Sequence, residues 1–244
     1  MTGHTLTEDQ SMRAAQTHSF LGSALCFALA LSMLACSDST GPAASRNEPG
    51  TGTATLRVTG EIEGQDVAGG FVTQMVVSVR DAAGAPVSGA AVIVRNGALG
   101  TVNLLELSAA SGDYEATVNT FASGDYRLDV TKGIDNVQGV VVGGLSAHRI
   151  LGPRADTTIT ANQPFTITWT RPSEAVAAEL ETHDFSVDAI TDAGSYTIAA
   201  VDNPARPDQR IRLWRYNQVN IAGGLAGSEL RLSIRNTVEP VVVQ

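Results

Sequence analysis

Four side chains near residue 213 combine cations with aromatic rings at a spacing of two. If 210–216 is a strand, one face carries all four, because successive side chains point to opposite sides: Arg210, Arg212, Trp214 and Tyr216. Such a face could stack on sugar rings or pair with anionic groups. The alternative is an ordinary two-faced strand with Ile211, Leu213 and Arg215 on its other face. Both faces contain apolar side chains, so the pattern leaves open which of them is buried.

A second group combines carboxylates with an imidazole. On a strand over 179–183, Glu179, Glu181 and His183 would share one face at the same period. Two carboxylates and an imidazole can bind a divalent cation. The alternative is a solvated edge strand whose charges discourage aggregation. The tight D-x-D spacing of calcium loops does not occur in the sequence.

The residue types that carry catalysis are not grouped in this sequence. The G-x-S-x-G turn typical of serine hydrolases is missing. His148 lies at the expected boundary between two halves of the chain, where we expect an exposed linker residue. Residues 223–228 are glycine-rich but lack the lysine that follows a phosphate-binding loop, which predicts a hairpin turn. We therefore expect a protein without enzymatic activity or cofactor.

Composition sets wider limits. Of the 244 residues, 43% are apolar and 17% are charged, which is too apolar for a wholly disordered chain. The formal net charge of -9 argues against nucleic-acid binding, which needs a clustered basic face. Two cysteines cannot form a disulfide-rich scaffold.

Beyond Gly52 the chain alternates between apolar and polar residues, with turns marked by Gly, Asp, Asn and Pro. This predicts an all-β fold. The expected strands are 54–62, 71–80, 90–95, 104–107, 114–119, 126–130, 137–142, 157–161, 165–170, 185–190, 196–201, 211–217, 229–236 and 238–243. The two prolines in 203–209 predict a loop. The candidate helix, 173–181, could equally be a loop followed by a strand.

The segment 77–130 resembles the bacterial Ig-like and carboxypeptidase-regulatory-like modules, in which D-x-x-G-x-P-V-x-G-A-x-V precedes two turns of the form G-x-Y. The matching residues are Asp81, Gly84, Pro86, Val87, Gly89, Ala90, Val92, Tyr114, Tyr126, Leu128 and Val130. The resemblance implies a seven-stranded sandwich without shared catalytic residues. Tyr114, Tyr126 and Tyr196 each follow a turn and are expected to be structural, as in a tyrosine corner. The second half has the strand pattern of an Ig-like or fibronectin III-like sandwich, with Trp169 as its core anchor.

The N-terminus reads as an export signal. Residues 20–35 form an uncharged run that is short for a membrane span and ends in small residues. Ser32–Cys36 resembles the lipobox of bacterial lipoproteins, which implies lipidation of Cys36; Ser37, where an inner-membrane signal would have Asp, favours the outer membrane. The alternative is a secreted protein with an ordinary signal peptide. A start at Met12 would give a more usual basic n-region than Met1.

The expected organisation is a signal peptide over 1–35, a lipidated tether over 36–52, and two consecutive sandwiches over 53–146 and 147–244. The predicted function is that of a lipid-anchored cell-envelope protein acting as a non-catalytic binding or structural module. Its partners would be the membrane and another envelope protein or a surface polysaccharide. The alternative is a carbohydrate-binding lipoprotein, and a metal-dependent or hydrolytic enzyme is the least favoured interpretation.

Overall fold

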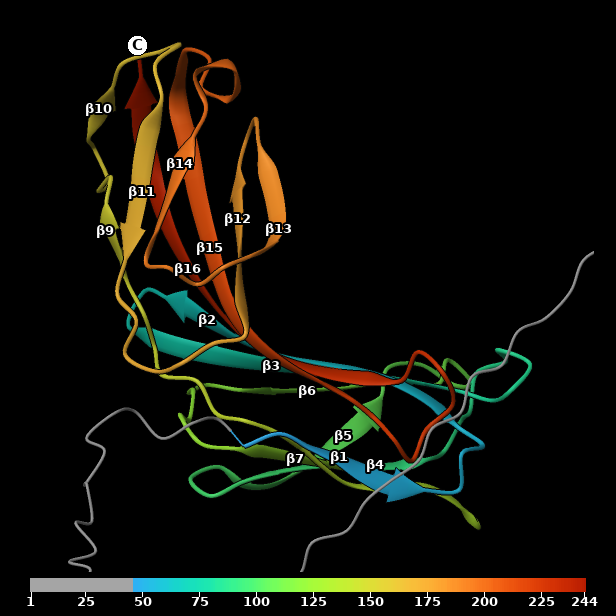
Figure 1. Ribbon diagram of the computed structural model, residues 1–244. Helices are drawn as coiled ribbons and strands as arrows, with labels where there is room; N and C mark the ends of the chain where they lie inside the picture. Colours follow the sequence, from blue (N-terminus) through green and yellow to red (C-terminus); the bar gives the residue numbers. More distant parts are fainter. Residues whose placement is uncertain (1–45) are drawn as a thin grey trace, which may run out of the picture. The chain divides into compact units, whose positions relative to one another are not determined.

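A computed structural model describes residues 46–244 of the chain (Figure 1). The predicted signal peptide, Cys36 and most of the tether lie outside these residues. The described part is almost entirely β-structure, as predicted, with one short 3-10 helix at Ala200–Asp202. None of its helices is long and apolar enough to cross a membrane.

Strands β2 to β8 form a first sandwich. Their bounds are β2 Arg57–Val67, β3 Gly70–Arg80, β4 Ala91–Asn96, β5 Gly100–Glu106, β6 Asp113–Val118, β7 Tyr126–Lys132 and β8 Asp135–Val142. One layer has the order β2-β3-β6-β5 and the other β4-β7-β8, with β5 also paired to β4. This is the ABED and CFG order of Ig constant-type domains. The Ig-like fold implied by the sequence resemblance is therefore present in this half.

Two tyrosines fix the turns of the first sandwich. The hydroxyl of Tyr126, at the start of β7, donates to the carbonyl of Ala122 at 2.9 Å, which is the tyrosine-corner arrangement. Burial raises the pKa of this phenol to about 12. The hydroxyl of Tyr114 instead donates to the carbonyl of Val87 at 2.7 Å and accepts from the amide of Ala90 at 2.8 Å. Both tyrosines are structural, as predicted.

The second sandwich also consists of two layers, but the numbers of strands in them differ from those of the first. Its strands are β9 Ile150–Gly152, β10 Thr158–Ile159, β11 Phe165–Trp169, β12 Ala177–Thr182, β13 Ser186–Ile190, β14 Ser195–Ile198, β15 Arg206–Asn220 and β16 Glu229–Val243. One layer is β9-β11-β14, and the other is β13-β12-β15-β16 with β10 added beside β16. Trp169 is 3% exposed and packs in this core, as expected.

The hairpin β15–β16 belongs to both sandwiches, which the sequence did not indicate (Figure 1). At one end Ile211, Leu213 and Val241 pack in the second core. At the other end β16 pairs in parallel with β2 from Glu229 to Arg235, and five side chains complete the first core: Val219, Ile221, Leu230, Leu232 and Ile234. The described residues belong to one compact unit, and the division into two folding domains at residue 146 stays a prediction.

Two local expectations need correction, and one open alternative is decided. Residues 48–52, assigned to the tether, form β1 Glu48–Gly52 beside β8. Their backbone pairs without an apolar pattern, and the close approach of Gly52 to Gly223 leaves no room for a side chain at either position. Residues 206–209 belong to β15 rather than to a loop, because a bulge accommodates Pro207. For residues 173–181 the second alternative is confirmed: a loop is followed by β12, which pairs with β15 along its whole length.

Sharing of the hairpin predicts that the two cores unfold together. Leu232→Ala removes a fully buried side chain from the first core, a change that costs about 2–5 kcal/mol. The native tryptophans, Trp169 and Trp214, both lie in the second half of the chain. We expect Leu232→Ala to lower the urea midpoint of tryptophan fluorescence as much as that of far-UV circular dichroism. A fluorescence midpoint equal to that of the wild type would mean that the cores unfold independently.

Candidate ligand-binding face

Strand β15 presents a charged and aromatic face to solvent. Ile211, Leu213 and Arg215 point inward and are fully buried, so alternation along the strand directs Arg210, Arg212 and Trp214 outward. Neighbouring strands β12, β16 and β2 add further charges on the same side. We call the resulting surface the Arg/Glu face; it consists of Arg210, Arg212, Arg231, Arg235, Glu61, Glu63, Glu179 and Glu181, with Trp214 and Tyr216.

Ion pairs connect the charges of this face across four strands. The carboxylate of Glu181 accepts from Arg210 at 2.9 Å and from Arg212 at 3.2 Å. Arg231 donates to Glu179 at 2.7 Å, and Arg235 approaches Glu63 at 3.2 Å; these last four charged side chains are between 18% and 27% exposed. The pairs are thus partly buried and form a network that crosses the sheet.

The two aromatic rings differ in accessibility. Trp214 is half-buried, its indole N–H donates to Glu63 at 3.2 Å, and the guanidinium of Arg235 lies 5.9 Å from its ring centre. Tyr216 is only 8% exposed, and Arg231 covers its ring at 4.0 Å. The structure thus brings all four predicted residues to one region, but it leaves Trp214 as the aromatic side chain that a ligand could reach.

The arginines of this face hold more donors than they use. The Nε–H groups of Arg210, Arg212 and Arg231 are out of contact with water and have no hydrogen-bond partner. An unpaired enclosed donor is unfavourable. A ligand rich in acceptor oxygens could satisfy these groups after small side-chain rotations.

The predicted metal-binding residues are arranged differently from a metal site. Glu179 and Glu181 do share a face of β12, but both pair with arginines. His183 lies beyond the end of β12, in the turn to β13. Among residues 46–244 no group of three His, Cys, Asp or Glu side chains could hold a metal ion.

Two hollows adjoin the Arg/Glu face. The first, which we call the His183 hollow, has a volume of about 480 Å³ and is lined by Glu181, Thr182, His183, Asp184, Phe185, Ser186 and Arg210. The second, the Glu61 hollow, has a volume of about 430 Å³ and is lined by Thr59, Gly60, Glu61, Val76, Ser78, Glu229 and Arg231. Each hollow includes one arginine and one glutamate of the face.

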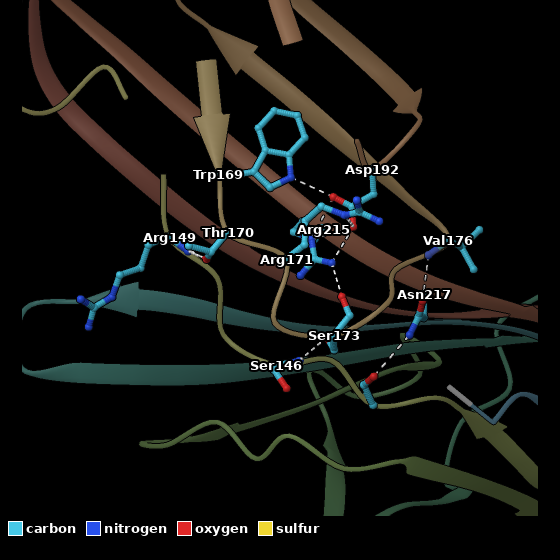
Figure 2. Close-up of polar contacts among 11 residues, drawn as sticks. Ser146, Arg149, Trp169, Thr170, Arg171, Ser173, Val176, Asp192, Arg215 and Asn217 are labelled. Carbon is cyan, nitrogen blue, oxygen red and sulfur yellow. Dashed lines mark hydrogen bonds and ion pairs between the residues drawn. The ribbon is translucent and has the colours of Figure 1, made fainter. Parts of the chain in front are cut away.

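The inward side of β15 holds a buried ion pair that the sequence analysis missed (Figure 2). Arg215 is fully buried, and its Nε donates to both carboxylate oxygens of Asp192 at 3.1 and 3.0 Å. The indole N–H of Trp169 donates to the same carboxylate at 2.8 Å. Burial alone would raise the pKa of Asp192, but the hydrogen bonds from Arg215 and Trp169 outweigh it and lower this pKa.

Side chains beside this ion pair form hydrogen bonds with the segment that connects the two sandwiches. Asn217 donates to the carbonyl of Gly143 at 2.8 Å, and its side-chain oxygen accepts from the amide of Val176 at 3.0 Å. The hydroxyl of Ser173 accepts from the amide of Ser146 at 2.8 Å, while the carbonyl of Ser173 accepts from Arg215 (Figure 2). The segment 143–150 is thereby fixed by residues distant in sequence.

His148 was expected to be exposed, and this expectation is wrong. The residue is 1% exposed, and neither ring nitrogen has a hydrogen-bond partner. Burial and the nearby charge of Arg215 lower its pKa to about 4. The backbone of Leu213 and the carboxylate of Asp192 offset part of this shift, although Leu213 makes no hydrogen bond of normal geometry to the ring. His148 is thus a neutral residue of the interior.

Comparisons with known proteins give no family for this chain. No protein-family model and no curated protein matches the sequence. Among solved structures, the fibronectin III-like modules of CbhA from Clostridium thermocellum have 15% identity and a TM-score of 0.26, over 73% of this chain and 92% of that one. The Yersinia pseudotuberculosis adhesin InvE has 16% identity and a TM-score of 0.26, over 78% and 60%. A Bacteroides ovatus glucan-utilisation protein, SGBP-B, solved with a mixed-linkage heptasaccharide, has 14% identity and a TM-score of 0.19, over 74% and 60%. Likenesses of this size do not bear on the function.

Burial of neutral His148 predicts a loss of stability in acid. The folded-state pKa of about 4 lies below the usual histidine pKa of 6.5, so protons bind more readily to the unfolded chain. The stability contribution is complete above pH 6.5 and is lost as the pH falls through the folded pKa, by on the order of 3 kcal/mol.

Urea unfolding from pH 7 to pH 4 would measure this effect. We expect His148→Gln to have a shallower pH dependence than the wild type between pH 6.5 and pH 4. The matched control is His183→Gln, in the exposed turn after β12, whose pH dependence should follow that of the wild type. Equal slopes for His148→Gln and the wild type would contradict the assignment.

Proposed function

We propose that this chain is an exported, lipid-anchored protein of the cell envelope that binds a ligand through the Arg/Glu face without transforming it. The observation that carries the proposal is the arrangement of paired charges around Trp214 on the outward side of the hairpin. The pairs offer a dense set of donors and acceptors at the surface.

The chemistry of this face suits binding better than catalysis. Three of its carboxylates, those of Glu63, Glu179 and Glu181, are paired with guanidinium groups. Thr182 and Ser186 line the same hollow as His183, but among the described residues no hydrogen bond joins the ring of His183 to either hydroxyl group. These features support a non-catalytic module.

A surface polysaccharide is the favoured ligand class. Trp214 offers a partly accessible ring on which a sugar could stack, and neighbouring arginines and glutamates can bind vicinal hydroxyl groups. Tyr216 supports the face from beneath Arg231 rather than contacting the ligand. An envelope protein with complementary charges is the second candidate, supported by the equal number of arginines and glutamates.

The N-terminal sequence supports the location. The lipobox-like segment ending at Cys36 supports lipid anchoring, because several acyl chains anchor a protein stably. Ser37, where the resembling inner-membrane signals have Asp, favours the outer membrane. The polar segment after Cys36 would separate the folded part from the lipid surface.

Binding through Trp214 can be tested by affinity electrophoresis in gels that contain a neutral polysaccharide: mixed-linkage glucan, galactomannan or arabinoxylan. We expect Trp214→Ala to weaken retention at least about tenfold, which corresponds to one aromatic contact. Its melting temperature should stay close to that of the wild type, because the side chain faces outward. Leu105→Ala, which removes a side chain that is 74% exposed on β5, is the control and should bind normally. Wild-type retention by Trp214→Ala would exclude this face.

Lipid anchoring can be tested by fractionating cells that express the full chain. The Cys36→Ser variant lacks the thiol to be acylated and should move from the membrane fraction to the soluble fraction. Cys26→Ser changes the cysteine within the apolar run and should leave the protein in the membrane fraction. Membrane association of Cys36→Ser equal to that of the wild type would rule out acylation at this residue.

A further inference from the structure

The Arg/Glu face extends well beyond the reach of one sugar ring. Arg210 lines the His183 hollow, and Arg231 lines the Glu61 hollow. Arg231 of β16 pairs in register with Gln218 of β15. Gln218 lies eight residues after Arg210 on the same strand. At the usual rise per residue this is about 26 Å along β15. Trp214 lies midway between Arg210 and Gln218.

Both hollows lie on the side of the sheet that carries Trp214. Arg210 shares the carboxylate of Glu181 with Arg212, which links the His183 hollow to the face. Arg231 reaches over the ring of Tyr216 to Glu179 and approaches Glu61 at 3.9 Å, which links the Glu61 hollow to the same face. The ion pairs therefore form a surface that runs from one hollow, past Trp214, to the other.

The charges of this surface select against a charged ligand. Four guanidinium groups are matched by four carboxylates, so the face has no formal excess of either sign. The whole chain has a net charge of -9, which repels polyanions at long range. The hollows add the hydroxyl of Ser186 at one end and those of Thr59 and Ser78 at the other, besides the carboxylates of Asp184, which pairs with Arg206, and of Glu229, which accepts from Gln218. Hydroxyl-rich neutral polymers match this chemistry.

We infer that the ligand is a neutral polysaccharide chain that contacts Trp214 at its centre and both hollows at once. This inference rests on the proposed function. It adds that the ligand is neutral, that it is long enough to reach both hollows, and that it lies along the hairpin β15–β16. The central ring binds any short segment of the polymer. The hollows contribute only when the segment is long enough to reach them.

The experiment is calorimetric titration with oligosaccharides of two, four and six units from mixed-linkage glucan, galactomannan and arabinoxylan. We expect affinity to increase at least about tenfold from two to six units for the polymer that binds. Ser186→Tyr would fill the His183 hollow and Thr59→Tyr the Glu61 hollow; both positions are outside the cores and lie in strands, which tolerate tyrosine. Each variant should weaken binding of the six-unit oligomer severalfold and leave binding of the two-unit oligomer unchanged.

The outcomes separate this inference from the proposed function. Equal affinities for two and six units, or wild-type binding of the six-unit oligomer by both tyrosine variants, would overturn the extended mode while leaving a binding module centred on Trp214. Tighter binding of heparin or polylysine than of any neutral oligomer would overturn the neutral ligand. If no neutral polysaccharide or oligomer binds the folded wild-type protein, polysaccharide binding itself fails.

Discussion

The ion pair between Arg215 and Asp192 is the interaction on which the rest of this structure depends. Both side chains are almost completely buried, and removing either partner would leave an uncompensated charge in the interior, typically at a cost of about 3–5 kcal/mol. Arg215 therefore has to point inward. Because a shift by one residue would reverse every side chain of the strand, this requirement also fixes Arg210, Arg212 and Trp214 on the outside.

The same strand joins the two sandwiches. The hairpin β15–β16 supplies the last two strands of one layer in the second sandwich and then continues beside β2 as an added strand of the first. Its tip contacts β1, where the amide of Ala222 donates to the carbonyl of Pro49 at 2.9 Å. A face that crosses from one sandwich to the other is therefore carried on continuous strands, whose hydrogen bonds hold its charges in register.

Local pattern was sufficient for most of the fold. Alternation located nearly all strands, and the turn motifs before Tyr114 and Tyr126 placed two structural tyrosines. Local alternation failed where the conformation of a segment depends on contacts with residues elsewhere in the chain. Glu48–Gly52 lacks apolar alternation and becomes a strand only because β8 offers an edge. His148 looks like a polar linker residue, yet the side chains of Thr170, Ser173, Asn217 and Asn236 fix the connecting segment around it.

The sequence by itself determined the all-β class and the two successive patterns of strands, and it divided the residues of β15 into two alternating faces. It could not decide which side of β15 faces solvent, because both sides contain apolar groups and arginine. The tertiary structure decided this by placing Asp192, from the turn between β13 and β14, beside Arg215. The structure also assembled Glu61, Glu63 and Arg231 with Trp214, since the parallel pairing of β2 with β16 brings together residues far apart in sequence.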